Sequence, residues 1–204
     1  MMSKSLELVV DQPDERAAKR ERVADAALIV FQRYGFARTT MSDIAEAVGM
    51  SRPALYLLFP NKEEIFAAAV LSANARNLRE IQSHLASMAD LEQQLTYACQ
   101  AWIGGGYDRV RQFPDARDMT DLPLPPVQEA YAAFQQLLAG LLADAAAGAR
   151  WDVTAEDLAR LLVAAMRGFK GEAVDRGDLD RMIALEVSAV VSALEHAGPI
   201  ASGN

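Results

Sequence analysis

The chain has 204 residues, of which 51% are hydrophobic and 24% charged, a composition typical of a folded protein and not of a disordered or fibrous one. Its single cysteine, Cys99, excludes an intramolecular disulfide and a thiolate metal cage built by this chain alone, so a reducing cytoplasm is the expected setting. No apolar run approaches the roughly 18 residues of a membrane span, and residues 1–14 lack the apolar core of a signal peptide, so neither a membrane protein nor an exported one is expected.

Charge is unevenly distributed along the chain. The formal net charge of −8 by itself argues against a polyanionic partner. Between Arg16 and Lys62, however, eight basic residues stand against four acidic ones, which leaves a net charge of −12 on the remainder. The sequence therefore predicts a mildly basic head, which could approach nucleic acid, and an acidic body, which could not.

Helix-forming residues dominate, and no sustained alternation of apolar and polar residues indicates a strand, so the sequence predicts an all-α protein of about nine helices. Gly35 is expected to end the first helix, Gly104 to Gly106 to break a later one, and the proline-rich stretch 113–126 to be irregular. The expected helices are 14–34, 41–48, 52–59, 62–87, 90–103, 126–147, 154–174 and 179–196, and the expected flexible tails are 1–13 and 199–204.

Residues 41–60 carry the pattern of a helix-turn-helix. Thr40 and Ser51 are suitable N-caps for two short helices, and Gly49 suits a left-handed turn between them. The second helix would present its N-terminal residues outward, at the end that enters the major groove in helix-turn-helix proteins. Apolar residues stand where the two helices must pack on each other and on the first helix: Ile44, Val48, Met50, Leu55 and Leu58. The sequence thus predicts a DNA-binding domain over 14–62, followed by a larger helical domain over 63–198.

The segment TTMSDIAEAVGMSRPALYLLFPNKEEIF resembles the N-terminal DNA-binding region of the TetR family of transcriptional regulators. The resemblance covers about residues 22–66, and beyond about residue 70 the chain is similar only in length and helix number. One departure is Leu58, because the family often has a histidine there that can contact the DNA backbone. The residues in the family order are Thr40, Asp43-Ile44-Ala45, Gly49, Ser51, Leu55-Tyr56, Phe59, Lys62 and Glu63.

The resemblance implies binding to double-stranded DNA as a homodimer. Thr40, Tyr56 and Lys62 would contact phosphates, whereas other residues of the second helix would face base edges. The simpler alternatives are that Tyr56 is a core aromatic and that Lys62 is a solvated charge. The candidate DNA-binding residues are Thr40, Ser42, Ser51, Arg52, Pro53, Ala54, Tyr56, Leu57 and Lys62.

The resemblance also implies a dimer interface on the last two helices and an effector pocket among the middle ones. Apolar residues on these helices fit both roles, although they would equally fit the chain's own core. The candidate interface residues are Leu158, Leu161, Leu162, Ala165, Ile183, Val187, Val190, Val191 and Leu194. The candidate effector-binding residues are Tyr97, Gln100, Trp102, Tyr107, Phe134, Met166 and Phe169.

The expected function is a ligand-responsive transcriptional repressor that binds a palindromic operator as a dimer and is released by an unidentified small molecule. The shortage of basic residues in the body favours an apolar or cationic effector over a strongly anionic one. No enzyme, cofactor or metal is expected, because two histidines and one cysteine occur without a catalytic triad, a phosphate loop or paired metal-ligand spacing. The alternative is a helical dimeric interaction or ligand-binding protein without operator binding, in which the helix-turn-helix serves only packing.

Overall fold

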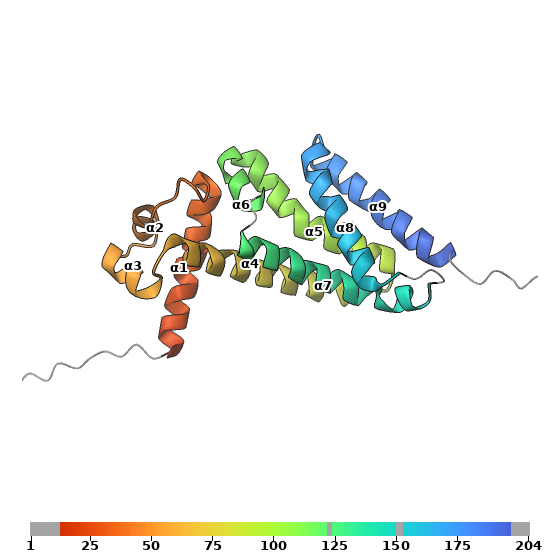
Figure 1. The fold of residues 1–204 in the computed structure, drawn as a ribbon, viewed down its shortest axis with the longest axis horizontal. Helices are drawn as coiled ribbons and strands as arrows, with labels where there is room; N and C mark the ends of the chain where they lie inside the picture. The colour runs from red at the N-terminus through yellow and green to blue at the C-terminus, as the bar shows by residue number, and fades with distance from the viewer. Residues whose placement is uncertain (1–12, 122–123, 150–152, 197–204) are drawn as a thin grey trace, which may run out of the picture.

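The computed structural model describes residues 13–121, 124–149 and 153–196, and within them the predicted all-α fold is confirmed (Figure 1). The two expected terminal tails lie almost wholly outside the described residues. Where the chain is described, none of the helices is both long and apolar enough to cross a membrane. The helices of the head and the first of the body are α1 (Pro13–Tyr34), α2 (Met41–Ala47), α3 (Arg52–Leu58) and α4 (Lys62–Leu85). The others are α5 (Leu91–Gln112), the 3₁₀ turn η1 (Pro114–Arg117), α6 (Asp118–Asp121), α7 (Pro125–Ala147), α8 (Ala155–Glu172) and α9 (Arg176–His196).

Local capping signals determine where most of these helices begin. The Thr40 hydroxyl accepts a hydrogen bond from the amide of Asp43, whose carboxylate accepts one in return from the Thr40 amide, and Thr154 and Asp157 form the same reciprocal pair at α8. Asn61 caps α4 through a single hydrogen bond, which its side-chain oxygen accepts from the backbone amide of Glu64 in the first turn. Each cap satisfies amides that would otherwise lack a partner, so the start of each helix is specified by sequence alone.

Two helix boundaries differ from those expected by more than two residues, and one stretch differs in regularity. The helix expected to end at 103 continues through three glycines to Gln112, since packing against α9 compensates for their poor helix propensity. The last helix begins at Arg176 instead of 179, because Asp175 accepts a hydrogen bond from the Asp178 amide at 2.8 Å and takes the capping position. The stretch 113–126 is also more regular than expected, since it holds η1 and α6.

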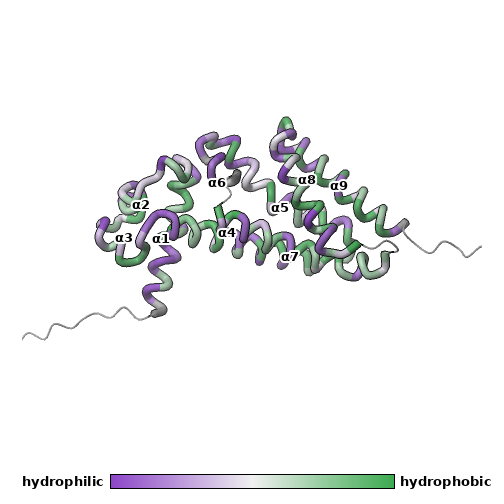
Figure 2. Tube along the Cα trace, viewed as in Figure 1, coloured by the Kyte–Doolittle hydropathy of each residue, from purple (hydrophilic) through white to green (hydrophobic). Residues whose placement is uncertain are grey.

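Helix α4 connects the two parts of the molecule. Its first turns pack against α1, which also carries α2 and α3, and its remainder runs into the body beside α5 and α7, while α8 and α9 lie at the end of the molecule away from the head (Figure 1). The N-terminal half of α1 is mostly hydrophilic, and apolar residues become frequent where helices face one another (Figure 2). The head is thus carried at one end of a long helix whose other end lies inside the body.

Two buried clusters hold the fold together. The body core includes Leu95, Phe134, Leu162 and Leu179, from four different helices. The head core is formed by Val23, Ala27, Phe31, Ile44, Ala45, Leu55, Leu58, Phe59, Ile65, Phe66, Met119 and Val127. The last two of these residues belong to α6 and α7, so body elements complete the core of the head.

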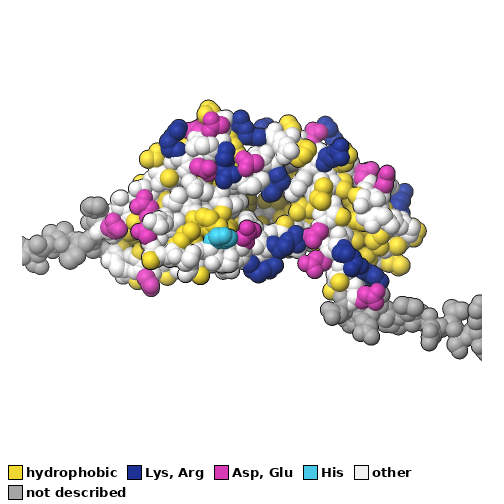
Figure 3. All heavy atoms as spheres, turned by 180° about the vertical axis from the view of Figure 1, so that it is seen from behind, with side chains coloured by type: hydrophobic (Ala, Val, Ile, Leu, Met, Phe, Trp, Pro, Cys, Tyr) yellow, Lys and Arg dark blue, Asp and Glu magenta, His cyan; other side chains and the backbone are white. Residues whose placement is uncertain are grey.

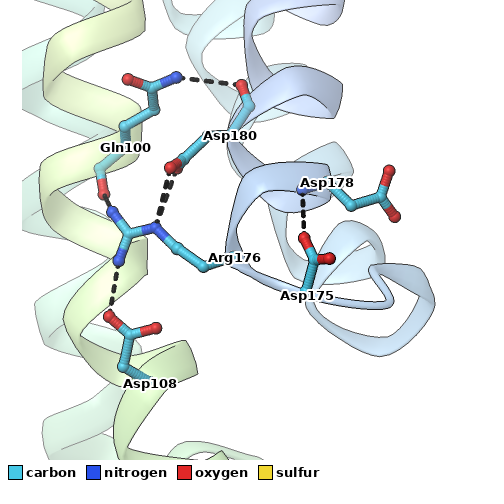
Figure 4. A network of polar contacts seen from close by, with 6 residues as sticks. All are labelled: Gln100, Asp108, Asp175, Arg176, Asp178 and Asp180. Atoms are coloured by element: carbon cyan, nitrogen blue, oxygen red, sulfur yellow. Dashed lines mark hydrogen bonds and ion pairs between the residues drawn. The ribbon is translucent and has the colours of Figure 1, made fainter.

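Arg176 joins α9 to α5 through a polar network (Figure 4). Its guanidinium donates to the Asp108 carboxylate at 2.8 Å and to the backbone carbonyl of Gln100 at 3.2 Å, while its Nε donates to Asp180 at 3.0 Å. The group passes directly over Gly104, where an added Cβ would lie 2.1 Å from Nη1. The glycine expected to break the helix therefore makes room for this contact.

Candidate nucleic-acid interface and ligand cavity

Helices α2 and α3 form a helix-turn-helix on the outer side of the head. Gly49 turns the chain between them with φ of 66°, in the left-handed region that favours glycine. Ile44 and Leu55 are fully buried beneath the two helices, and the Ser51 oxygen accepts the amide of Ala54 at 3.3 Å to begin α3. The accepted bonds from Thr40 lower the pKa of the Asp43 carboxyl below its ordinary value, which strengthens the cap of α2 at neutral pH.

The N-terminal turn and outer face of α3 are open to solvent. Arg52 and Pro53 are exposed, Tyr56 is 45% exposed and Leu57 77% exposed, whereas Ala54 is half-buried. The exposure of Tyr56 disagrees with the alternative of a core aromatic. Among the described residues, the Arg52 side chain has neither a hydrogen bond nor an ion pair. This face therefore presents one unpaired cation with apolar and hydroxyl groups beside it, and exposed Thr40 and Ser42 lie at the start of α2.

The structure gives Lys62 a different role from the phosphate contact expected from the sequence. Its ammonium donates to the carbonyls of Phe36, Ala37 and Thr39 at 2.9, 3.2 and 3.0 Å, and it lies 4.6 Å from the centre of the Phe36 ring. All three donors of the ammonium are thereby used. Lys62 holds the connection between α1 and α2 onto α4, and this arrangement leaves it no donor for DNA.

Sequence reasoning missed two arginines of α1 that hold the end of α3. Arg16 donates to the carbonyl of Leu57 at 3.2 Å, and Arg20 donates to that of Leu58 while lying 3.9 Å from the centre of the Phe59 ring. Cations at a helix C-terminus neutralise its partial negative charge. The only signal in the sequence was the cluster of basic residues in α1, which does not say whether they face DNA or protein.

A cavity of about 420 Å³ lies among α1, α4, α5 and α7. Trp102 lines it, and its indole N–H donates to the Asn74 side-chain oxygen at 2.9 Å. Phe134 stacks behind Trp102 at 4.4 Å between ring centres and is fully buried. Trp102 is the one expected effector residue found in this lining. The other six fall outside it, and the Gln100 side chain instead donates a hydrogen bond to the Asp180 carbonyl of α9. These six are Tyr97, Gln100, Tyr107, Phe134, Met166 and Phe169.

Most of the expected interface residues are packed inside the body. Ala165 and Val190 are half-buried, but Leu161 on α8 is 59% exposed, and Leu185 on α9, which was not among the expected interface residues, is 65% exposed. The buried members are Leu158, Leu162, Ile183, Val187, Val191 and Leu194. A partner chain could therefore meet Leu161 and Leu185, while the buried residues support these helices from within.

Residues 23–69 match the family model described as bacterial regulatory proteins, tetR family. The head of the chain is therefore similar to the DNA-binding domain of the TetR family. The matched region begins in α1, includes the whole helix-turn-helix and ends in the first turns of α4. TetR-family proteins regulate transcription and are not enzymes, which agrees with the chemistry expected from the sequence.

Two TetR-like relatives, both from Pseudomonas putida, are the probable HTH-type transcriptional regulator ArpR and the HTH-type transcriptional regulator TtgR. They are 38% and 37% identical to this chain over 82 residues. Each alignment covers 40% of this chain and 37% of the relative, so the similarity spans well under half of either protein.

The likeness to known structures extends beyond the matched head. The structure of the transcriptional regulator FadR from Bacillus subtilis, in complex with stearoyl-CoA, superposes with a TM-score of 0.66. The superposition covers 84% of this chain and 97% of FadR at 17% sequence identity. At this identity the likeness shows a shared fold, in which head and helical body have the same arrangement.

Proposed function

We propose that this chain is a transcriptional repressor that binds a palindromic operator as a homodimer in the cytoplasm and leaves it when a small molecule enters the cavity. The observation that carries the proposal is the exposed N-terminal face of α3, on which Arg52 has no partner among the described residues, in a head that matches the TetR family model. A recognition helix needs such a face to reach base edges in the major groove.

In this proposal some residues of α2 and α3 contact base edges and others contact the phosphates of the DNA. Arg52 pairs with a guanine through both arms of its guanidinium, and each such contact discriminates between bases by roughly 1 to 3 kcal/mol. The half-buried Ala54, exposed Pro53 and exposed Leu57 offer apolar contacts to thymine methyl groups, while the hydroxyls of Thr40, Ser42 and Tyr56 reach the phosphates. Ser51 acts through its cap, which positions the first turn of α3. Leu58 is buried and takes no part, in place of the family's frequent histidine.

Dimerisation would set the distance between two such heads. A single helix-turn-helix makes too few contacts for tight specific binding, so half-sites are read by a pair. Helices α8 and α9 of two chains would form a four-helix bundle, with the exposed Leu161 and Leu185 at its seam.

Helix α4 would carry the signal from the cavity to the head. Val70, Asn74 and Asn77 of α4 line the cavity, and Lys62 at its first turn holds the connection that leads into α2. A ligand that displaces α4 therefore moves the head and changes the separation of the two recognition helices.

A mobility-shift assay with the promoter region beside the protein's own gene tests the proposal. We expect a specific band that weakens as salt concentration rises. Arg52→Ala should weaken this band and relax the base preference at the position that Arg52 contacts, whereas the matched variant Arg79→Ala, on the exposed side of α4, should leave this preference unchanged. Leu161→Asp should convert the dimer to a monomer in sedimentation velocity and weaken the band. A folded dimer without any specific band would contradict operator binding and favour the alternative of a helical interaction protein.

A further inference from the structure

We propose that the ligand of the cavity is an amphiphilic organic anion, with an apolar body and one carboxylate, and that Arg109 binds the carboxylate. The inference rests on the proposed function only in taking this cavity as the effector site. It names the chemical class of the effector from the charges and surfaces that the cavity brings together.

The wall of the cavity is somewhat more apolar than polar, and its volume of about 420 Å³ is that of a site for a small organic molecule. Trp102 offers an aromatic surface whose N–H is already occupied by Asn74, so it has no donor left for a ligand. The apolar side chains in the lining include Val70, Ile103, Val110, Met119 and Val127. Burial of an alkyl or aryl group against them would supply most of the binding free energy.

The charged groups of the lining are predominantly cationic. They are Arg76, Arg109 and Lys170, against one carboxylate, that of Glu80. Arg76 is already neutralised by Asp25, which it contacts at 2.6 Å, and it also bonds the Ser72 hydroxyl. On the face of the molecule that Figure 3 shows, Lys and Arg side chains, with some Asp and Glu side chains among them, border a hollow near the middle. The local charge is therefore opposite to the overall charge of the body, and it was this overall charge that favoured an apolar or cationic effector.

Arg109, unlike Arg76, is not in contact with a carboxylate of any residue that the structure describes. Its guanidinium forms no hydrogen bond or ion pair with any residue that the structure describes, and it lies along α5 within 3.6 Å of where a Cβ on Gly105 would stand. Taken as a whole, the Arg109 residue is exposed to solvent. Its guanidinium is nevertheless partly surrounded by protein, and this desolvation lowers the pKa of Arg109, whereas the charge of the neighbouring Asp108 acts to raise it. An arginine remains charged in proteins, so this group gains from an anion.

A carboxylate suits this position better than other anions of one charge. Its two oxygens match the parallel N–H groups of a guanidinium, and the apolar wall begins directly beside them. Lys170 of α8 adds positive charge to the same lining. A neutral alcohol of the same chain length would leave Arg109 unpaired, and an amine would be repelled.

The test compares octanoate, 1-octanol and octylamine by calorimetric titration of the full-length protein without DNA. A Trp151→Phe variant leaves Trp102 as the single tryptophan, so quenching of its fluorescence reports binding in the cavity. We expect octanoate to bind at least tenfold more tightly than the other two. Arg109→Gln should remove this preference, Arg109→Lys should retain part of it, and the control Arg79→Gln should leave it intact.

Equal affinity for octanoate and octanol, a preference for octylamine, or unchanged octanoate binding in a folded Arg109→Gln protein would each overturn the inference. Failure of all three compounds to bind the folded protein would overturn it as well. Release of operator DNA by octanoate is measured separately. If octanoate binds through Arg109 and no operator complex exists, the proposed function fails and the ligand class stands.

Discussion

At the scale of single residues, charge alone does not show whether a side chain faces DNA or protein. Lys62 and Arg20 both donate to backbone carbonyls of the head, yet in the sequence they look the same as Arg52, whose guanidinium is unpaired among the described residues. The difference arises from the folded backbone, which brings carbonyls of residues far apart in the chain within reach of the first two. Only the caps could be assigned in advance, because their partners are three residues away.

Replacement of Lys62 distinguishes its structural role from a phosphate contact. Lys62→Met keeps the length of the side chain and removes the donors to Phe36, Ala37 and Thr39, so the free energy of unfolding should fall by about 1.5 to 3 kcal/mol. Urea unfolding measures the loss. The slope of log K for DNA against log salt concentration should stay the same, and a decrease of about 1 in this slope would instead show a lost phosphate contact.

Gly104 and Arg176 should be energetically coupled. Gly104→Ala alone displaces the guanidinium and so loses its bonds to α5, which offsets the gain of about 1 kcal/mol from replacing a helical glycine. In an Arg176→Ala background nothing is displaced, and the same substitution should be stabilising. A double-mutant cycle measured by thermal unfolding should give a coupling of at least about 0.5 kcal/mol. Additive effects would mean that Arg176 is held elsewhere in solution.

At the scale of elements, η1 and α6 form the second connection between body and head, beside α4. Asp118 accepts the amides of Phe36 and Ala37 at 2.9 and 2.8 Å, and Asp115 pairs with Arg38 at 2.8 Å. The next residue, Met119, lines the ligand cavity and belongs to the head core. This short segment thus contacts both the cavity and the connection that leads into the helix-turn-helix.

The two carboxylates of this segment should differ in their contribution to stability. Asp118→Ala leaves two backbone amides without their acceptor and should lower the free energy of unfolding by about 1 to 3 kcal/mol, with faster hydrogen exchange at Phe36 and Ala37. Asp115→Ala removes an ion pair in which both side chains are more than half exposed, so its effect should stay within about 0.5 kcal/mol. Equal effects of the two variants would contradict the role of Asp118.

Elements specified by local signals were predictable, and those specified by distant partners were not. The caps at Thr40, Ser51 and Thr154 set helix starts correctly, and the TetR-like pattern around Gly49 identified the helix-turn-helix. The continuation of α5 through its glycines depends on Arg176, which is remote in sequence. The cavity depends in the same way on which face of α5 meets α4, and this is why only Trp102 of the expected effector residues lines it.

At the scale of the whole molecule, the head and the body share a core across the boundary expected at residue 62. Phe66, Met119 and Val127 lie beyond that boundary and are buried against head residues, with Phe31 and Phe66 in edge-to-face contact at 5.3 Å between ring centres. A ligand that moves α4, α6 or α7 therefore acts directly on the packing of the head. No hinge between separate domains is needed to transmit the change.

This shared core predicts that a small truncation in α7 destabilises the head. Val127→Ala removes buried methyl groups from the head core and should lower the protection of the α1 to α3 amides against hydrogen exchange by about 1 to 3 kcal/mol. Val163→Ala is the matched control, because it makes the same truncation at similar burial within the body core. A loss of head-amide protection with Val127→Ala alone would show that Val127 supports the head through a local contact. An equal loss of protection with Val127→Ala and Val163→Ala would show that the chain unfolds as one cooperative unit. Unchanged protection of the head with Val127→Ala, while the body is destabilised, would show that the head folds independently of α7 and would contradict the shared core.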